Sequence, residues 1–106
     1  MMKKKFKVFY TTCEKKNDAI KIAKNLLLKK NAICINIFKN IESFYCENNT
    51  ITSSAELVLI IKTHNSKKVI ERILGKIHPY ETPIILEIKV NQPNKKYLDW
   101  FLKNSE

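Results

Sequence analysis

The chain has 106 residues, of which 44% are hydrophobic and 28% charged, so it can bury a core but is too short for two domains. Its formal net charge of +10 raises the question of a nucleic-acid partner. Arg72 is the only arginine, however, and the lysines are spread along the whole chain, which indicates a solvated basic surface. We therefore expect one domain, residues 1–106, without a nucleic-acid partner.

Cysteine usage and hydropathy favour the cytoplasm. Cys13, Cys34 and Cys46 form no CxxC pair, and the apolar part of the N-terminus, residues 6–10, is too short for a signal peptide. No apolar run approaches the roughly 20 residues that span a membrane. We expect free thiols in a reducing compartment and no membrane partner.

The first two expected elements are a strand and a helix. Residues 5–12 are rich in aromatic and β-branched side chains, which is typical of a strand. From Ala19 onwards, apolar side chains recur at intervals of three and four with lysines between them, which indicates an amphipathic helix. Asn17 or Asp18 would cap its start, and Asn31 would end it in a left-handed conformation.

A long hairpin is expected next. Residues 32–38, mostly apolar and rich in Ile, suit a central strand with both faces covered or nearly so. Asn48 and Asn49 suit a tight turn, because Asn tolerates positive φ. The return strand begins near Ile51 and strengthens over residues 56–63, ELVLIIKT. The tip of this hairpin should project beyond the body.

The second half predicts a helix, a strand and a last short helix. Asn65 or Ser66 would cap a helix over residues 67–77, in whose last turn the only glycine, Gly75, costs about 1 kcal/mol against alanine. Close packing of that turn would explain the glycine. The stretch IHPYETP, residues 77–83, then stops the helix, since the residue before a proline disfavours the α region.

After the second proline of that stretch, residues 84–90 suit a strand. Pro93 or Asn94 starts the final helix. The resulting order, β-α-β-β-α-β plus a C-terminal helix, predicts an α+β fold of the ferredoxin-like type with two helices on one face of an antiparallel sheet. The other face needs cover from the C-terminal helix or another subunit. We favour a homo-oligomer in which the hairpin grasps a neighbour.

The strongest candidate site is the group His78, Tyr80 and Glu81. A neutral imidazole binds metal ions or moves protons, and the carboxylate and phenol add charge and a hydrogen bond. The alternative is a helix-ending turn whose polar groups satisfy nearby backbone. No glycine-rich phosphate loop, Ser-His-Asp order or zinc-finger spacing is present, so we expect no enzyme.

Two further candidates lie in the predicted strands. The Cys34 thiolate would suit a soft copper ion, although a buried cysteine is usually an inert hydrophobe. Lys62 ends an apolar strand, and we expect the C-terminal ends of the first and third strands to lie near the same edge region. There Lys62 would meet an anionic ligand or carboxylate, or simply extend to water.

Several of these pieces recur together in one known family. They are Thr12, AIKIAK at residues 19–24, Ala32, Cys34, Asn36, SFY at residues 43–45, ELVLIIKT, HPYETP at residues 78–83 and YLDW at residues 97–100. In this order and spacing, over about residues 7–101, they resemble the CutA family of divalent-cation tolerance proteins.

The resemblance implies a tight homotrimer, similar in outline to the PII signalling proteins, with a cytoplasmic address and a link to copper and other divalent metal ions. Cys34 matches the family cysteine, and the polar residues facing the cleft between subunits match Lys62, His78, Tyr80 and Glu81. The chain departs at the hairpin tip, where Cys46-Glu47-Asn48-Asn49-Thr50 replaces a Trp-x-Gly pattern, and at Cys13, where relatives carry a small residue.

Two functional hypotheses follow. The first is a non-enzymatic trimeric protein of divalent metal tolerance, with copper(II) as a candidate ion held by His78 and helped by Glu81 or a thiol such as Cys34. The alternative is a PII-like sensor that binds an anionic small molecule in the intersubunit cleft against Lys62, Tyr80 and Glu81. RNA binding is disfavoured, because the third strand has no aromatic pair on which bases would stack.

Overall fold

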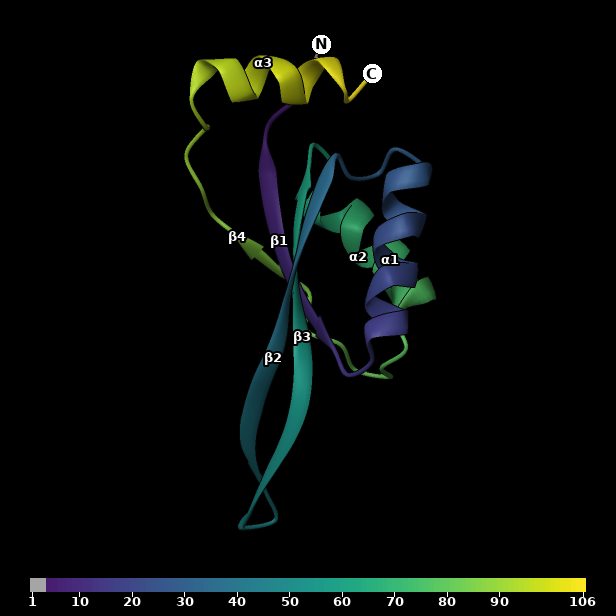
Figure 1. The fold of residues 1–106 in the computed structure, drawn as a ribbon, viewed down its shortest axis with the longest axis vertical. Coiled ribbons are helices and arrows are strands. Elements are labelled where there is room, and N and C mark those ends of the chain that lie inside the picture. The colour runs from purple at the N-terminus through teal and green to yellow at the C-terminus, as the bar shows by residue number, and fades with distance from the viewer. Residues whose placement is uncertain (1–3) are drawn as a thin grey trace.

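Seven elements follow one another in the computed structural model, which describes residues 4–106 (Figure 1). They are β1 (Lys7–Cys13), α1 (Lys16–Leu28), β2 (Cys34–Glu47), β3 (Thr50–Thr63), α2 (Lys67–Ile77), β4 (Leu86–Ile88) and α3 (Lys95–Lys103). The order is the expected one, and the longest elements are the two 14-residue strands of the hairpin.

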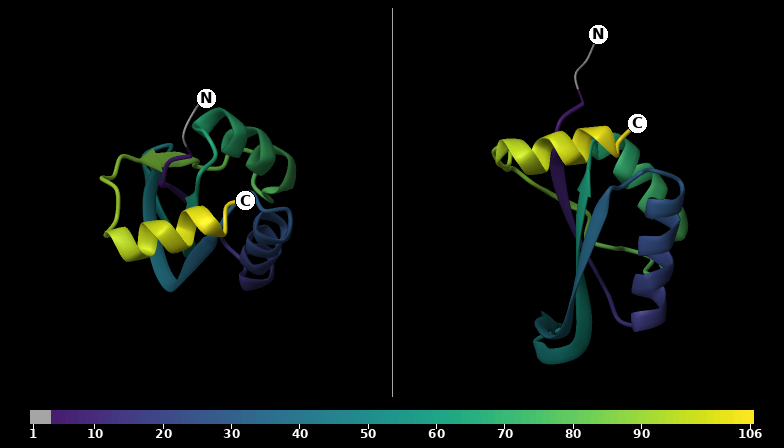
Figure 2. Two further views of the ribbon diagram at one scale, coloured as in Figure 1. Left: turned by 90° about the horizontal axis from the view of Figure 1, so that it is seen from above. Right: turned by 45° about the horizontal axis from the view of Figure 1, so that its top comes forward.

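The strands form one antiparallel sheet in the order β2-β3-β1-β4. Both α1 and α2 lie on the same side of this sheet, while α3 crosses one end of it (Figure 2). The predicted ferredoxin-like α+β class is therefore confirmed. No helix within residues 4–106 has the length and apolar character needed to cross a membrane.

A single apolar cluster fills the space between the sheet and the helices α1 and α2. Its buried members are Phe9, Cys13, Ala19, Ile22, Leu26, Ala32, Leu57, Leu59, Ile61, Ile70 and Leu74. The helices contribute side chains at spacings of three and four, and the strands contribute every second residue, as their periodicities require. Because side chains alternate along a strand, the residues of β1 and β3 that lie between these inward-facing ones point to the opposite face of the sheet.

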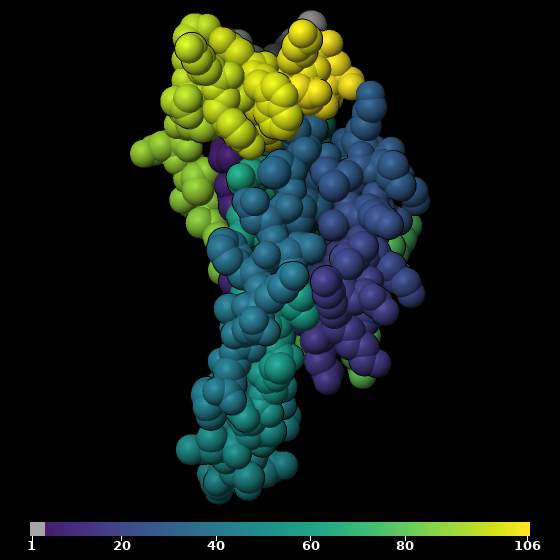
Figure 3. Space-filling view, viewed as in Figure 1, coloured from purple at the N-terminus to yellow at the C-terminus, as the bar shows by residue number. Residues whose placement is uncertain are grey.

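The β2–β3 hairpin projects well beyond the body (Figure 3). Asn48 and Asn49 have φ values of 51° and 63°, which confirms the predicted Asn-Asn turn. Nearer the body, the pairing shifts register between Phe38 and Ile41, and Asn40 adopts a φ of 60° there. This β-bulge bends β2 and increases its twist.

Several expected details at the ends of elements are wrong. Residues 34–38 open β2, which is an edge strand rather than a central one, and Phe38 is 54% exposed. Helix α1 begins after Lys15 without a side-chain cap, and Lys30 rather than Asn31 takes the positive φ, at 58°. Ser66 does cap α2, because its Oγ accepts from the Val69 amide.

The sheet surface turned away from α1 and α2, here called the outer face, is largely apolar. Its side chains include Val8, Tyr10, Thr12, Cys34, Asn36, Phe38, Val58, Ile60, Lys62, Leu86 and Ile88. Helix α3 covers its upper end, where Lys62 Nζ lies 5.8 Å from the centre of the Tyr97 ring. Phe38 and Leu86 stay 54% and 48% exposed, so this subunit alone leaves part of the outer face uncovered.

The close-packing explanation for Gly75 is wrong, and this leads to a prediction. Among the described residues, a Cβ added at Gly75 meets no neighbouring atom within 4 Å, and the glycine has no positive φ. We expect Gly75→Ala to raise the free energy of unfolding by about 0.5–1 kcal/mol, because alanine costs less backbone entropy in a helix. Urea denaturation followed by circular dichroism measures this, and a destabilised variant would contradict it.

Candidate functional site

A partly buried carboxylate organises the junction of the body and the hairpin. Glu56 on β3 accepts a hydrogen bond of 2.6 Å from Ser43 Oγ on β2 and one of 2.8 Å from Tyr80 Oη on the α2–β4 loop. The three side chains come from three segments, so only the folded chain brings them together. Together with His78, we call this group the Glu56 corner.

His78 is held at the end of β1. The Tyr80 amide donates to its Nδ1 at 3.0 Å, so Nδ1 carries no proton and Nε2 does. Nε2 then donates to the Thr12 carbonyl oxygen at 2.9 Å, with Thr11 Oγ1 at 3.1 Å. Burial lowers the pKa of His78, despite the Thr12 bond and the charges of Asp18 and Glu56, so the ring stays neutral at neutral pH.

The charges in the Glu56 corner are set by the same contacts. Burial raises the pKa of Glu56, but hydrogen bonds from Ser43, Tyr80 and Thr12 outweigh it and hold this pKa below its usual value. Burial and the Glu56 carboxylate raise the pKa of Tyr80 well above its usual range. Tyr80 therefore stays a donor and Glu56 an anion throughout the neutral range.

An open hollow lies beside the Glu56 carboxylate. Its volume is about 280 Å³, and it is lined by Glu14, Lys16, Lys39, Asn40, Ala55, Glu56 and Leu57. The bulge at Asn40 helps to form this hollow, because it moves β2 aside next to Glu56. Two acidic and two basic residues thus line one hollow at the base of the hairpin.

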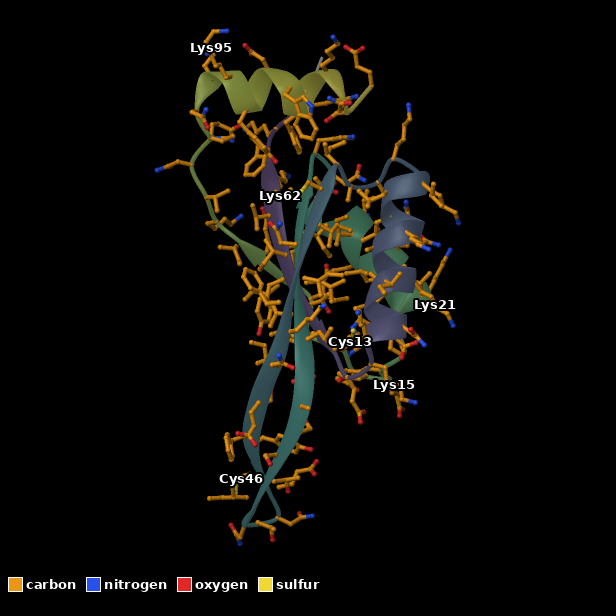
Figure 4. All side chains as sticks on the ribbon, in the orientation of Figure 1. Cys13, Lys15, Lys21, Cys46, Lys62 and Lys95 are labelled. Carbon is orange, nitrogen blue, oxygen red and sulfur yellow. The ribbon has the colours of Figure 1, made fainter. Side chains whose placement is uncertain are left out.

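Lys62 and Cys34 lie apart from this corner. They pair across the β2–β3 ladder near α3, and Figure 4 shows Lys62 close beneath that helix. The expectation that β1 and β3 end near the same edge region is wrong: the strands are antiparallel, so Lys62 pairs with Val8 while Cys13 pairs with Leu57. Lys62 and His78 therefore do not share a site within one subunit.

The remaining candidates have different surroundings. Glu81 is exposed and takes no part in the Glu56 corner. Cys13 is fully buried, and burial raises the pKa of its thiol, which makes it an unreactive core residue. Cys46 is exposed near the hairpin tip (Figure 4), and all three cysteines are free, as expected.

The donor set of one subunit does not fit a metal ion. Within residues 4–106, no three His, Cys, Asp or Glu side chains are grouped so that they could hold one. Both ring nitrogens of His78 are engaged with the protein, one as acceptor and one as donor. A metal ion would need donors from a second subunit, or the release of one of these hydrogen bonds.

Sequence reasoning missed the central residue, Glu56. A hairpin centred on Asn48 and Asn49 predicts that Ser43 lies opposite Ser54, two residues from Glu56, and that register is observed. Counting residues back from the turn could therefore have placed the Ser43 hydroxyl near the Glu56 carboxylate. The contact of Tyr80 with Glu56 had no local signal, because 24 positions separate the two residues.

These features define a ferredoxin-like subunit with a polar corner at the base of a long hairpin and a partly uncovered outer face. The sequence model of the CutA1 divalent ion tolerance protein family matches residues 7–104. The chain therefore belongs to this family, and the resemblance found in its sequence is confirmed.

Individual relatives agree with this assignment. The divalent-cation tolerance protein CutA of Archaeoglobus fulgidus is 39% identical over 93 residues, covering 86% of this chain and 89% of the relative. The CutA homolog of Xenopus laevis is 33% identical over 92 residues, and the match spans 61% of its length. The crystal structure of the divalent ion tolerance protein CutA1 from Ehrlichia chaffeensis superposes with a TM-score of 0.90 at 32% identity, covering 99% of both chains.

The pKa of His78 leads to a prediction for the metal-free protein. Its folded pKa lies below the ordinary value of 6.5, so the unfolded chain binds more protons as the pH falls through that range. The stability is therefore complete above pH 6.5 and declines below it, and Glu56 adds a further loss below its ordinary value of 4.5. We expect His78→Gln to flatten the decline in melting temperature between pH 7 and pH 5.

The control for this prediction is the other histidine. Burial and the charge of Lys4 also lower the pKa of His64, so His64→Gln should remove a separate share of the decline. Melting curves at matched ionic strength measure both variants. If the melting temperature of His78→Gln fell with pH as steeply as that of the wild type, protonation of His78 would not be a cause of the decline.

Proposed function

We propose that this protein is a non-enzymatic, homotrimeric, cytoplasmic protein of divalent metal ion tolerance that binds copper(II) or a similar ion between subunits. The observation that carries the proposal is the partly buried Glu56 carboxylate, which accepts hydrogen bonds from Ser43 and Tyr80 and lines a hollow together with Glu14. Membership of the divalent ion tolerance family supports the link to metal ions.

The outer face supports the oligomeric part of the proposal. Apolar side chains such as Phe38, Ile60 and Leu86 share this face, and α3 covers only one end of it. The projecting hairpin adds further exposed apolar groups, including Phe44 and Ile51 at 67% and 75% exposure. Contiguous apolar surface of this kind marks protein interfaces.

The metal part of the proposal centres on the Glu56 corner. Glu56 and Glu14 line one hollow next to the outer face, and carboxylate oxygens bind divalent cations. A second subunit seated on the outer face would bring further donors to this hollow. His78 then acts as a ligand if an ion displaces one of its hydrogen bonds, and otherwise as the residue that positions Tyr80 through the Nδ1 contact.

Copper titration by calorimetry tests the proposal, with the oligomeric mass measured on the same samples by light scattering. We expect the wild type to bind copper, Glu56→Gln to weaken binding about tenfold or more, and Glu71→Gln, an exposed carboxylate on α2, to bind as the wild type does. Equal affinities of the two variants would exclude Glu56. Unchanged binding by His78→Ala would exclude His78, and binding by a monomer would exclude an intersubunit site.

One observation favours the PII-like alternative. Among residues 4–106, neither ion pair involves Lys62; its ammonium group lies 5.8 Å from the centre of the Tyr97 ring at the upper end of the outer face. An anionic ligand in a cleft between subunits would meet this charge. A thermal-shift screen of anionic metabolites, repeated with Lys62→Gln, separates the hypotheses: stabilisation that depends on Lys62 favours the sensor.

A further inference from the structure

A second hollow lies between the two helices, on the side of the molecule away from the outer face. This interhelical groove has a volume of about 290 Å³. It is lined by Asn25, Lys29, Asn31, Arg72, Ile73, Lys76 and Ile77. The α1 and α2 layer that contains it lies opposite the outer face (Figure 2), so a trimer formed through the outer face would leave the groove open.

Three cationic residues, Lys29, Arg72 and Lys76, line this groove. No Asp or Glu lines it, and the two ion pairs among residues 4–106 are formed elsewhere, by Lys89 with Glu87 and by Lys95 with Asp99. Arg72 and Lys76 stand four positions apart on α2, where like charges repel and weaken a helix. An anion bound between them would relieve that repulsion.

The single arginine of the chain lies in this groove. The sequence has 20 Lys and Arg residues together, and Arg72 is the only arginine. A guanidinium presents a planar fork of donors that matches phosphate oxygens two at a time, whereas an ammonium acts as a point charge. Arg72, whose side chain is suited to bidentate phosphate recognition, thus lies in a groove that is also lined by two lysines and two asparagines.

The amides complete a donor set. Asn65 Nδ2 donates to Asn31 Oδ1 at 3.3 Å, which turns the amide so that its own NH₂ group remains available as a donor. The carbonyl oxygens at the end of α1, which would repel an anion, already accept amide hydrogens from the turn that follows, including those of Lys29 and Asn31. Ile73 and Ile77 add apolar lining to the groove.

We propose that the interhelical groove is a binding site for a small, multiply charged anion that carries two or more phosphate groups. Convergence of three cations on one short hollow favours such an anion over a long polyanion, for which an extended basic track would be needed. The site is separate from the Glu56 corner and from Lys62, so it stands whether or not the metal proposal does.

Calorimetry with inorganic triphosphate tests this site, in EDTA and at constant ionic strength so that metal chelation does not contribute. We expect saturable binding by the wild type and a loss of roughly tenfold or more in affinity for Arg72→Gln and for Lys76→Gln. Arg72→Lys should recover part of the affinity, since it restores the charge but not the fork. Amide chemical shifts should change at the ends of α1 and α2 that line the groove.

The matched control is Lys67→Gln. Lys67 belongs to the same helix, is exposed, and stands about 140° and 180° around the helix from Arg72 and Lys76 at 3.6 residues per turn. We expect this variant to stay within about twofold of the wild type, because Lys67 does not line the groove. Equal losses in Lys67→Gln and Arg72→Gln would show diffuse charge attraction and overturn the proposal.

Two further outcomes would also overturn it. Loss of triphosphate binding in Lys62→Gln but not in Arg72→Gln would place the anion in the intersubunit cleft. Tighter, Arg72-dependent binding of a single-stranded RNA oligonucleotide than of triphosphate would assign the groove to a macromolecule. The triphosphate titration contains no metal ion, so it tests the interhelical groove even if the protein does not bind copper.

Discussion

Phe101→Ala is expected to lower the free energy of unfolding by about 3–5 kcal/mol, which is the usual cost of emptying a buried phenylalanine site. Phe101 lies on α3, is fully buried, and packs edge-on against Phe6, with ring centres 5.0 Å apart. Phe6 in turn contacts Tyr97 at 6.0 Å. The substitution therefore removes one of the two aromatic contacts that join α3 to Phe6, the residue before β1.

The measurement is urea denaturation followed by circular dichroism at a fixed protein concentration, because the stability of an oligomer depends on concentration. Trp100→Ala is the matched control: it removes an aromatic side chain from the same helix, but one that is 48% exposed. We expect it to cost about 1 kcal/mol. Equal losses in the two variants would show that Phe101 does not anchor α3.

The elements of this fold could be predicted because each carries its own local pattern. The 3.6-residue repeat in α1 and α2 and the Asn48-Asn49 turn need no information from distant segments. Element ends were less predictable. The end of α1 depends on which residue takes the left-handed conformation, and Lys30 does so while Asn31 uses its backbone and side-chain oxygens to accept from Thr63 and Asn65.

The order of the strands limited what could be said about the edges of the sheet. The apolar sequence of residues 32–38 suggested a central strand, but β2 lies at an edge and presents Phe38 to solvent. An apolar edge strand looks the same in sequence as a central one, because both have side chains to cover.

The candidate site was only half predictable for a similar reason. IHPYETP was identified as a helix stop that bears His78 and Tyr80, and both do lie in the Glu56 corner. Their partners, Glu56 and the Thr12 carbonyl, are distant in sequence and depend on the register of β1 with β3. Glu81, adjacent in sequence, is exposed instead.

The second large effect is expected from Ile60→Asp. Ile60 is partly exposed at the middle of the outer face, between Tyr10 on β1 and Asn36 on β2. If the proposed trimer forms through the outer face, each subunit would have to bury an unpaired carboxylate there, which costs several kcal/mol. Because about 1.4 kcal/mol corresponds to a tenfold change in affinity, we expect the trimer to dissociate at least roughly a hundredfold more readily.

Light scattering over a concentration series measures this dissociation, and Leu28→Asp is its control. Leu28 is 81% exposed at the end of α1, on the side of the sheet away from the outer face, so the same new charge should leave the oligomer intact. Circular dichroism distinguishes a folded monomer from an unfolded chain, and a folded monomer would show that Ile60 is buried between subunits. An unfolded chain would instead show that the carboxylate disrupts the sheet itself, and would contradict the expected dissociation of folded subunits. A trimer of unchanged mass and stability in Ile60→Asp would instead place the interface elsewhere, and the intersubunit metal site would lose its second set of donors.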